Sequence, residues 1–276
     1  VLASGSEKSY IWSLSRSGVL TVSGSALPDF VGDGSSIPWR DHSGRILSVA
    51  IESGVTSVGS GAFRGCEKLT QIIIPDTVEV LDLNEHIGCT SFERYDVADG
   101  NKAYASIDDV LFNADKTQLI SYPFGKTGSY TVPDAVTSIA KVAFASSCIE
   151  RIVLPDSVTQ IGESSFSNCS KLKSILLPNG ITSLPDSLFS GCTVLEEIGI
   201  PESVKTLGKA VFSGCSALKE VTIPSPVVVI PDEAFSGCVM LEKITILAGV
   251  AAIGENAFKD CTALKTVNFL GNDKQW

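Results

Sequence analysis

The sequence predicts a solenoid of the α/β class, rich in short strands and poor in helix, in which similar coils stack along one axis. The main observation is a repeat of 23 residues: phenylalanines recur at that spacing, and a cysteine follows each of them three positions later. The marks are Phe166, Phe189, Phe212, Phe235 and Phe258, with Cys169, Cys192, Cys215, Cys238 and Cys261. A fixed period between about 20 and 50 residues is typical of an array in which each unit is one coil.

Each unit contains one expected strand. In the unit that begins at Leu172, Ile175 and Leu177 alternate with outward positions, which is the period of a strand with one buried face. Pro178 then ends the strand, because proline cannot donate to a sheet ladder. On the return path we expect a helical turn or irregular backbone before the phenylalanine.

The repeated apolar positions predict the core. A single coil is too small to bury its own apolar face, so neighbouring coils must supply the missing contacts. The phenylalanine and cysteine positions are therefore expected to point inward along the whole array, and they extend backward to Phe63, Cys66 and Phe144.

The repeat resembles a known family. The pattern L-x-x-I-x-L-P-x-x-V-x-x-I-x-x-x-x-F-x-x-C, as in Leu195 to Cys215, is similar to the BspA-like subclass of leucine-rich repeats, and the match runs from Ile46 to the C-terminus. The resemblance implies a right-handed coil with a parallel sheet on one face. It also implies a secreted or surface-anchored protein of host-associated bacteria or some parasitic protists, of a family associated with adhesion to host cells, matrix proteins and other microbes.

Residues 1–45 break the period. They are expected to form short strands at Ile11 to Ser15 and Val19 to Ser23, around a turn at 16–18. The segment resembles the N-terminal β-cap of many bacterial members, with Trp12 and Trp39 expected in the cap core. The predicted domains are therefore a cap at 1–45 and a repeat solenoid at 46–276. Because the first residue is valine and not an initiator methionine, we expect the chain to begin after a removed signal segment or at an artificial boundary. The expected extracellular or cell-surface location rests mainly on the family resemblance.

A second irregularity lies at about 92–129. Two runs, Ile107 to Phe112 and Gln118 to Tyr122, are expected to form a hairpin around a turn at 113–116. The segment resembles an insertion common in the same family, matching it at residues that include Asn101 and Tyr104. Asp109 stands where the family usually has glycine; aspartate is among the least costly residues at positive φ because its side chain can bond locally.

Composition and charge argue against nucleic-acid binding and against a membrane-spanning segment. The chain has 31 acidic and 21 basic residues, a net charge of -10, which argues against nucleic-acid binding because phosphate contacts need clustered Lys and Arg. The sequence contains no run of 18 apolar residues, which is about the length that a membrane-spanning helix needs. We expect no cofactor and a monomer.

The eight cysteines permit a disulfide framework, but their positions favour free thiols. Stacked coils seldom give the Cβ directions that a disulfide needs, and cysteine packs well as a small buried apolar residue. Cys89 shares the inward position by alignment, and Cys148 falls one position late. The absence of a C-x-x-C motif argues against a metal centre.

Catalytic and metal-binding candidates are few. Of the two histidines, His42 and His86, the second falls at a phenylalanine position, where a partly buried core substitute is the main interpretation and a site at the disturbed end of the insertion is the other. The acidic residues Asp96, Asp99 and the pair Asp108 and Asp109 lack the full spacing of a calcium loop and are expected to be solvated. We therefore expect no catalytic residue and no metal ligand.

The outward strand positions form the one systematic surface. We select six of them as a candidate binding surface, in which apolar side chains have a polar rim: Arg151, Val153, Ser174, Leu176, Ile73 and Glu197. Exposed apolar patches of this kind often mark partner sites. The alternative is that β-branched residues simply suit a sheet surface.

The predicted function is a non-enzymatic extracellular module that presents this surface to a protein or glycan partner. The family resemblance implies that this partner comes from a host. The alternative is a structural spacer that holds another domain away from a cell surface and has no ligand of its own.

Overall fold

The computed structural model describes residues 1–276 except 31, 33, 83–89 and 272–276. The chain divides into two compact units. Unit 1 contains Val1–Lys116 and Ser121–Lys126, and unit 2 contains Thr117–Ile120 and Thr127–Trp276.

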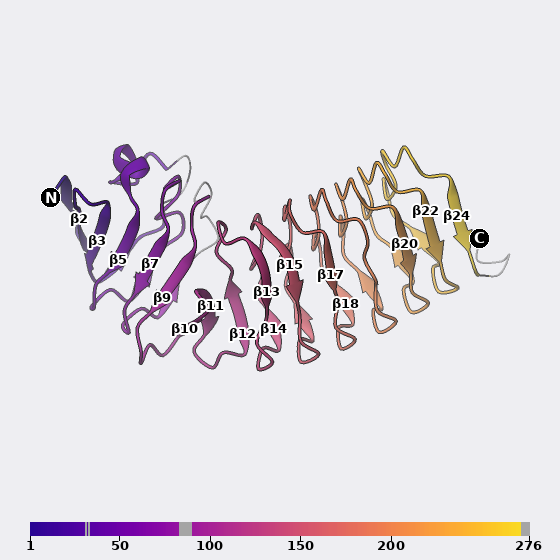
Figure 1. Ribbon diagram of the computed structural model, residues 1–276, viewed down its shortest axis with the longest axis horizontal. Helices are drawn as coiled ribbons and strands as arrows, with labels where there is room; N and C mark the ends of the chain where they lie inside the picture. The colour runs from indigo at the N-terminus through magenta and orange to yellow at the C-terminus, as the bar shows by residue number, and fades with distance from the viewer. Residues whose placement is uncertain (31, 33, 83–89, 272–276) are drawn as a thin grey trace. The chain divides into compact units, whose positions relative to one another are not determined.

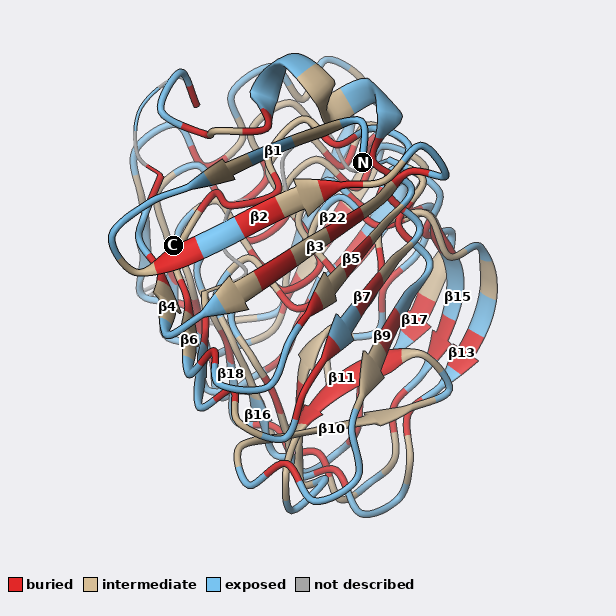
Figure 2. Cartoon of the chain, turned by 90° about the vertical axis from the view of Figure 1, so that its left-hand side faces the viewer, coloured by how far each residue is buried: buried red, intermediate tan, exposed pale blue. Residues whose placement is uncertain are grey.

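Unit 1 is built on a six-stranded sheet (Figure 1). Its strands, in spatial order, are β1 (Ala3–Ser6), β2 (Tyr10–Leu14), β3 (Val19–Gly24), β5 (Ser48–Ile51), β7 (Gln71–Ile74) and β9 (Arg94–Val97). The first three pair antiparallel, and pairing is parallel from β3 onward. A second row contains β4 (Ala26–Leu27), β6 (Ser57–Val58) and β8 (Val80–Leu81). Strands β2 and β3 alternate buried and more exposed residues, so one face of the sheet covers the core (Figure 2).

Unit 2 repeats a two-strand coil. The longer strands are β13 (Gly128–Thr131), β15 (Ile149–Val153), β17 (Ser174–Leu176), β20 (Glu220–Ile223), β22 (Lys243–Ile246) and β24 (Thr266–Phe269). The return path holds short strands: β12 (Gln118–Ser121), β14 (Ser138–Ile139), β16 (Gln160–Ile161), β18 (Ser183–Leu184), β19 (Thr206–Leu207), β21 (Val229–Ile230) and β23 (Ala252–Ile253). Neighbouring coils pair in parallel, with a shift of 23 residues from β15 onward, as in Ile244 with Val267, and a shift of 22 between β13 and β15.

The strand-rich solenoid is confirmed, but the α/β label is not. Within the described residues the single helix is a short 3₁₀ segment, Arg40–Arg45. Of the two expectations for the stretch before the phenylalanine, a helical turn or irregular backbone, the second holds: a two-residue strand is followed by tight turns. The apolar residues at these positions point inward in either case, so the repeat pattern did not separate the two possibilities.

The repeated phenylalanines form one stacked column in unit 2. Rings of neighbouring coils lie 5.1–5.6 Å apart between centroids and within 22° of parallel from Phe144 to Phe258. Burial is complete for Phe144, Phe166, Phe189, Phe212 and Phe235, and nearly so for Phe63 in unit 1. Phe258 is only half-buried, as is Cys261 in the same coil.

Left-handed residues flank each phenylalanine. Around Phe212, Ala210 has φ 51° and Gly214 has φ 73°. This alternation turns three N–H groups, of Ala210, Phe212 and Gly214, toward the next coil, where they donate to carbonyls of Asp232, Ala234 and Ser236 at 3.0, 2.9 and 2.7 Å. Glycine takes positive φ at little cost. At Ala210 this conformation is less favourable, and the hydrogen bonds to the next coil hold it in place.

The cysteine column has a hydrogen-bonding role that sequence reasoning missed. Five thiols of unit 2 each donate to the carbonyl of a phenylalanine in the preceding coil, as Cys215 Sγ does to Phe189 O at 3.1 Å; the other four are Cys169, Cys192, Cys238 and Cys261. Burial raises the pKa of the Cys215 thiol to about 12. A small residue with a weak donor suits this position, because the carbonyl it satisfies is buried.

All seven described cysteines are free, which confirms that part of the prediction. Cys66, Cys169, Cys192, Cys215 and Cys238 are buried. In the short coil of Phe144, Ser147 takes the inward position in place of Cys148, and its hydroxyl lies 3.6 Å from Cys169 Sγ. Cys89 lies outside the described residues.

The N-terminal segment covers the carbonyl edge of the first coil. Phe30 N donates to Ser60 O at 2.8 Å, and Trp39 Nε1 donates to Ala62 O at 3.0 Å. The Trp39 ring is fully buried and stacks on Phe63, with centroids 6.4 Å apart. Trp39 thus supplies the aromatic ring and the hydrogen-bond donor that a preceding coil supplies elsewhere in the array.

The predicted hairpin of the insertion is right in part. Strands occur at both predicted runs, β11 (Val110–Asn113) and β12 (Gln118–Ser121), with a turn between them. The first run begins later than predicted, because Ile107 ends another strand, β10 (Tyr104–Ile107), which pairs antiparallel with β11 around Asp108 and Asp109. Both aspartates have positive φ, 49° and 70°, so Asp109 takes a conformation in which glycine is common.

Candidate functional site on the strand face of unit 2

The outward face of β15 and β17 exposes an apolar patch. Arg151 lies beside Ser174, and Val153 lies beside Leu176, in parallel register. Leu176 is 79% exposed and Val153 47%. Arg151 is also exposed and forms no ion pair with any residue that the structure describes. We call Arg151, Val153 and Leu176 the strand patch.

Ile73 does not belong to the strand patch. It lies on β7 of unit 1, where it is 39% exposed, whereas the strand patch lies in unit 2. The sequence placed these residues in one column by their repeat position, but the structure joins only the pair on β15 and β17. Ile73 as part of a binding surface stays a prediction.

The coil after β17 has lost its strand. The sequence predicts one strand per coil, but 195–200 contains none. Glu196 N donates to Lys173 O and Lys219 N donates to Glu196 O, both at 3.3 Å; beyond these bonds, no backbone bond joins 197–200 to β17 or β20 among the described residues. Two features of the sequence account for the loss. Gly199 weakens a strand, and the repeat places Glu197 beside Glu220, a like-charge pair.

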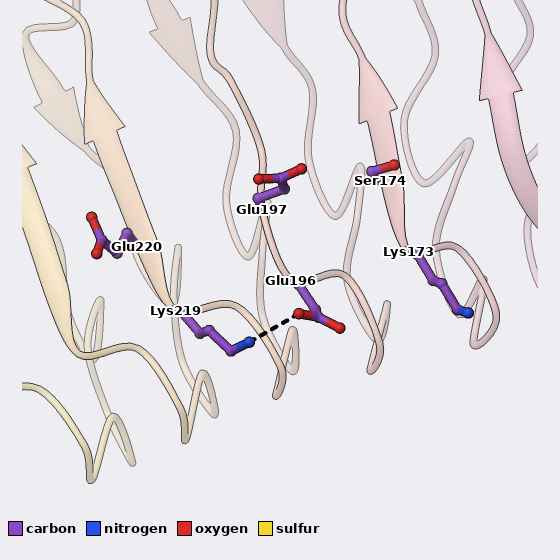
Figure 3. A pocket seen from close by; sticks show the side chains of 6 residues that line it. All are labelled: Lys173, Ser174, Glu196, Glu197, Lys219 and Glu220. Carbon is purple, nitrogen blue, oxygen red and sulfur yellow. Dashed lines mark hydrogen bonds and ion pairs between the residues drawn. The ribbon is translucent and has the colours of Figure 1, made fainter.

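A shallow hollow of about 530 Å³ lies where the strand is missing (Figure 3). Its lining residues are Lys173, Ser174, Glu196, Glu197, Lys219 and Glu220. In Figure 3 Glu196 and Lys219 lie together at one rim, while Glu197 and Ser174 lie higher on the face. Ser174 and Glu197, two of the residues selected from the sequence, thus share one site, and its lysines are residues that sequence reasoning missed.

Alternating charge links the coils at the rim. Lys173, Glu196, Lys219, Glu242 and Lys265 follow one another at the 23-residue spacing. Lys219 Nζ lies 2.9 Å from Glu196 Oε2, and this bond lowers the pKa of the Glu196 carboxyl and raises that of the Lys219 ammonium group. Glu220 pairs with Lys243 at 3.1 Å. Such exposed pairs contribute little to stability, so they chiefly set the charge pattern of the surface.

Two charges of the hollow remain unpaired. Neither Lys173 nor Glu197 forms an ion pair or side-chain hydrogen bond within the part of the chain that the structure describes. One is basic and one acidic, and they lie on neighbouring coils. The hollow therefore offers an ammonium group and a carboxylate to a ligand that has both charges.

Two acidic residues of the insertion form ion pairs with basic side chains. Lys126 Nζ lies 2.8 Å from Asp109 Oδ2 and also donates to Asp108 O, while Arg94 lies 3.3 Å from Asp96 Oδ2. Asp99 is exposed. No group of three or more His, Cys, Asp or Glu suited to a metal occurs among the residues described. His42 is partly exposed in the 3₁₀ segment, and His86 lies outside the described residues.

Comparison with protein families gives a match over most of the chain. The model of the BspA type leucine rich repeat region matches residues 41–132 and 137–265 in six copies. The chain belongs to the BspA-type leucine-rich repeat family. The resemblance drawn from the 23-residue pattern is confirmed.

Solved structures of related fold extend the comparison of this BspA-type chain. A leucine-rich repeat protein from Eubacterium ventriosum is 24% identical with a TM-score of 0.55, covering 95% of this chain and 83% of its own. The pneumococcal vaccine antigen PcpA is 22% identical with a TM-score of 0.62, covering 88% of this chain and 87% of its own. These likenesses support the fold. Comparison with curated proteins gives no match. None of the helices described is long and apolar enough to cross a membrane.

Proposed function

We propose that this BspA-type protein is a non-enzymatic binding module, outside the cell or on its surface, that holds a protein or glycan partner through the strand face of unit 2. The observation that carries the proposal is the strand patch. In the strand patch a leucine that is 79% exposed lies beside a half-exposed valine, with an unpaired arginine at the rim. Burial of this apolar surface by a partner would lower the free energy of the complex. The description of PcpA as a vaccine antigen supports an exposed location.

The test is a double substitution in the strand patch. Arg151→Glu with Leu176→Asp is expected to abolish attachment of the protein to immobilised host matrix, because it reverses the rim charge and places a carboxylate on the apolar surface. The thermal melting temperature should hardly change, since both side chains are exposed. Attachment is measured by surface plasmon resonance on matrix protein and mucin glycan surfaces.

A matched control makes the test specific. Lys265→Glu with Asn268→Asp changes the net charge by the same amount at two exposed positions of the last coil. This variant should attach like the wild type. If the strand-patch variant also attaches like the wild type, the strand face is not the binding surface.

The alternative function, a structural spacer, makes a different prediction. A spacer that lacks two whole coils, residues 218–263, would have a shorter reach, while point substitutions in the strand patch would leave attachment unchanged. Loss of attachment by the strand-patch variant therefore excludes a pure spacer.

We also propose the domain organisation drawn from the sequence: a cap at 1–45 and repeats at 46–276, with an insertion at about 92–129. The bonds from Phe30 N and Trp39 Nε1 support the cap, because they satisfy carbonyls that a preceding coil would otherwise satisfy.

A further inference from the structure

We propose that the hollow at the missing strand binds an extended peptide with an arginine, seated on Glu197, and an acidic residue two positions away, seated on Lys173. This inference rests on the proposed function and names the chemistry of the partner. Three observations carry it: the two unpaired charges, their spacing, and the space above Gly199.

The unpaired carboxylate of Glu197 selects a cation. Its neighbours in the hollow are already engaged, Glu196 with Lys219 and Glu220 with Lys243. A carboxylate flanked by satisfied ion pairs gains most from a new donor. Arginine fits better than lysine because its planar guanidinium group can bind both carboxylate oxygens.

Lys173 supplies the second charge of the site. An acid on the ligand can bind its ammonium group, whereas a purely acidic ligand would meet the three glutamates of the lining. The charge pattern thus favours a partner with both charges.

The spacing of the two charges matches an extended chain. Lys173 and Glu197 lie on neighbouring coils and are offset by one residue along the strand direction, since Lys173 is level with Glu196. With coils about 4.8 Å apart and about 3.3 Å per residue, their backbones are roughly 6 Å apart. Residues i and i+2 of an extended peptide lie on one face at roughly 7 Å, whereas i and i+1 point to opposite faces.

The irregular coil leaves room on the outward face. A Cβ added at Gly199 would meet no atom within 4 Å, so the outward position beside Leu176 is open space. A side chain of the ligand can settle there without displacing an atom of the protein.

The test uses a labelled peptide and fluorescence anisotropy at low ionic strength. The probe is Gly-Ser-Arg-Ser-Asp-Ser-Gly, and the comparison peptide, Gly-Ser-Arg-Asp-Ser-Ser-Gly, has the same composition with its charges on opposite faces. We expect the probe to bind the full chain at least tenfold more tightly than the comparison peptide. Salt should weaken the binding, because the contacts are exposed.

Three variants assign the binding to the hollow. Glu197→Gln and Lys173→Gln should each weaken probe binding about tenfold or more, as expected for loss of a charged hydrogen bond. Gly199→Leu should block it by filling the open space. Glu242→Gln, an exposed carboxylate outside the hollow, is the matched control and should change binding less than about twofold.

The outcomes separate this inference from the proposed function. Equal binding of the two peptides, no binding of either, or an unchanged affinity in Glu197→Gln would overturn the peptide site. If the strand-patch variant still loses attachment to matrix in that case, the proposed function stands without it. If neither set of variants alters attachment, the proposed function fails as well.

Discussion

Replacing Phe212 with alanine should lower the free energy of unfolding by about 3–5 kcal/mol. The ring is fully buried between Phe189 and Phe235, with centroids at 5.6 and 5.3 Å. Its removal leaves a cavity that the neighbouring coils can close only by breaking the backbone ladder on both sides. Urea unfolding followed by circular dichroism measures the loss.

The same change at Phe258 is the internal comparison. This ring is half-buried and stacks on one neighbour in the described chain, Phe235, so its loss should be clearly smaller. In an array of stacked coils, stability is close to a sum of nearest-neighbour terms, and the last coil has fewer of them. Equal losses at the two positions would contradict a core built by stacking.

Replacing Asn101 with alanine should cost roughly 4 kcal/mol, a large loss for a polar residue. The Asn101 side chain is buried and makes four hydrogen bonds. Nδ2 donates to Pro75 O at 2.7 Å and Val78 O at 3.1 Å, and Oδ1 accepts from Ala103 N and Tyr104 N, both at 2.8 Å. Alanine would remove this partner from all four backbone groups, and Pro75 O would keep only its 3.5 Å bond from Val78 N.

Two further variants control the Asn101 experiment. Asn101→Asp keeps the shape but turns both donors into acceptors facing carbonyls, so it should destabilise unit 1 about as much as alanine does. Lys102→Ala, at the exposed neighbouring position, should change stability by less than about 0.5 kcal/mol. A small effect of Asn101→Ala would mean that water replaces the side chain, and that the insertion is not fastened to the preceding coil by this residue.

The sequence predicts the core of this fold well because stacking forces identical residues into identical positions. Phe189 and Phe212 lie one coil apart in the chain and one coil apart in space, so a period of 23 residues is also a contact pattern. The backbone around them was not predictable by the same means. Left-handed conformations at Ala210 and Ser187 are imposed by bonds to the next coil, and neither residue type signals them locally.

The candidate site was predictable only in part, because it depends on a departure from the repeat. The outward positions of Ser174 and Leu176 follow from strand alternation, and both residues lie on the outward face of β17 in the structure. The hollow follows instead from the failure of one coil to form its strand. Gly199 and the glutamate pair at Glu197 and Glu220 are visible in the sequence, but their combined effect appears only once neighbouring coils are placed side by side.

Hydrogen–deuterium exchange of the chain, free and bound to a matrix protein that it captures, tests the central claim most directly. Residues 197–200 make no backbone hydrogen bond in the described chain, so their amides should exchange fast in the free protein. The account predicts that binding slows exchange in peptides covering 149–153, 173–177 and 196–201. Slowing confined to the phenylalanine turns, such as 163–168 and 186–191, with no change at 196–201, would contradict it.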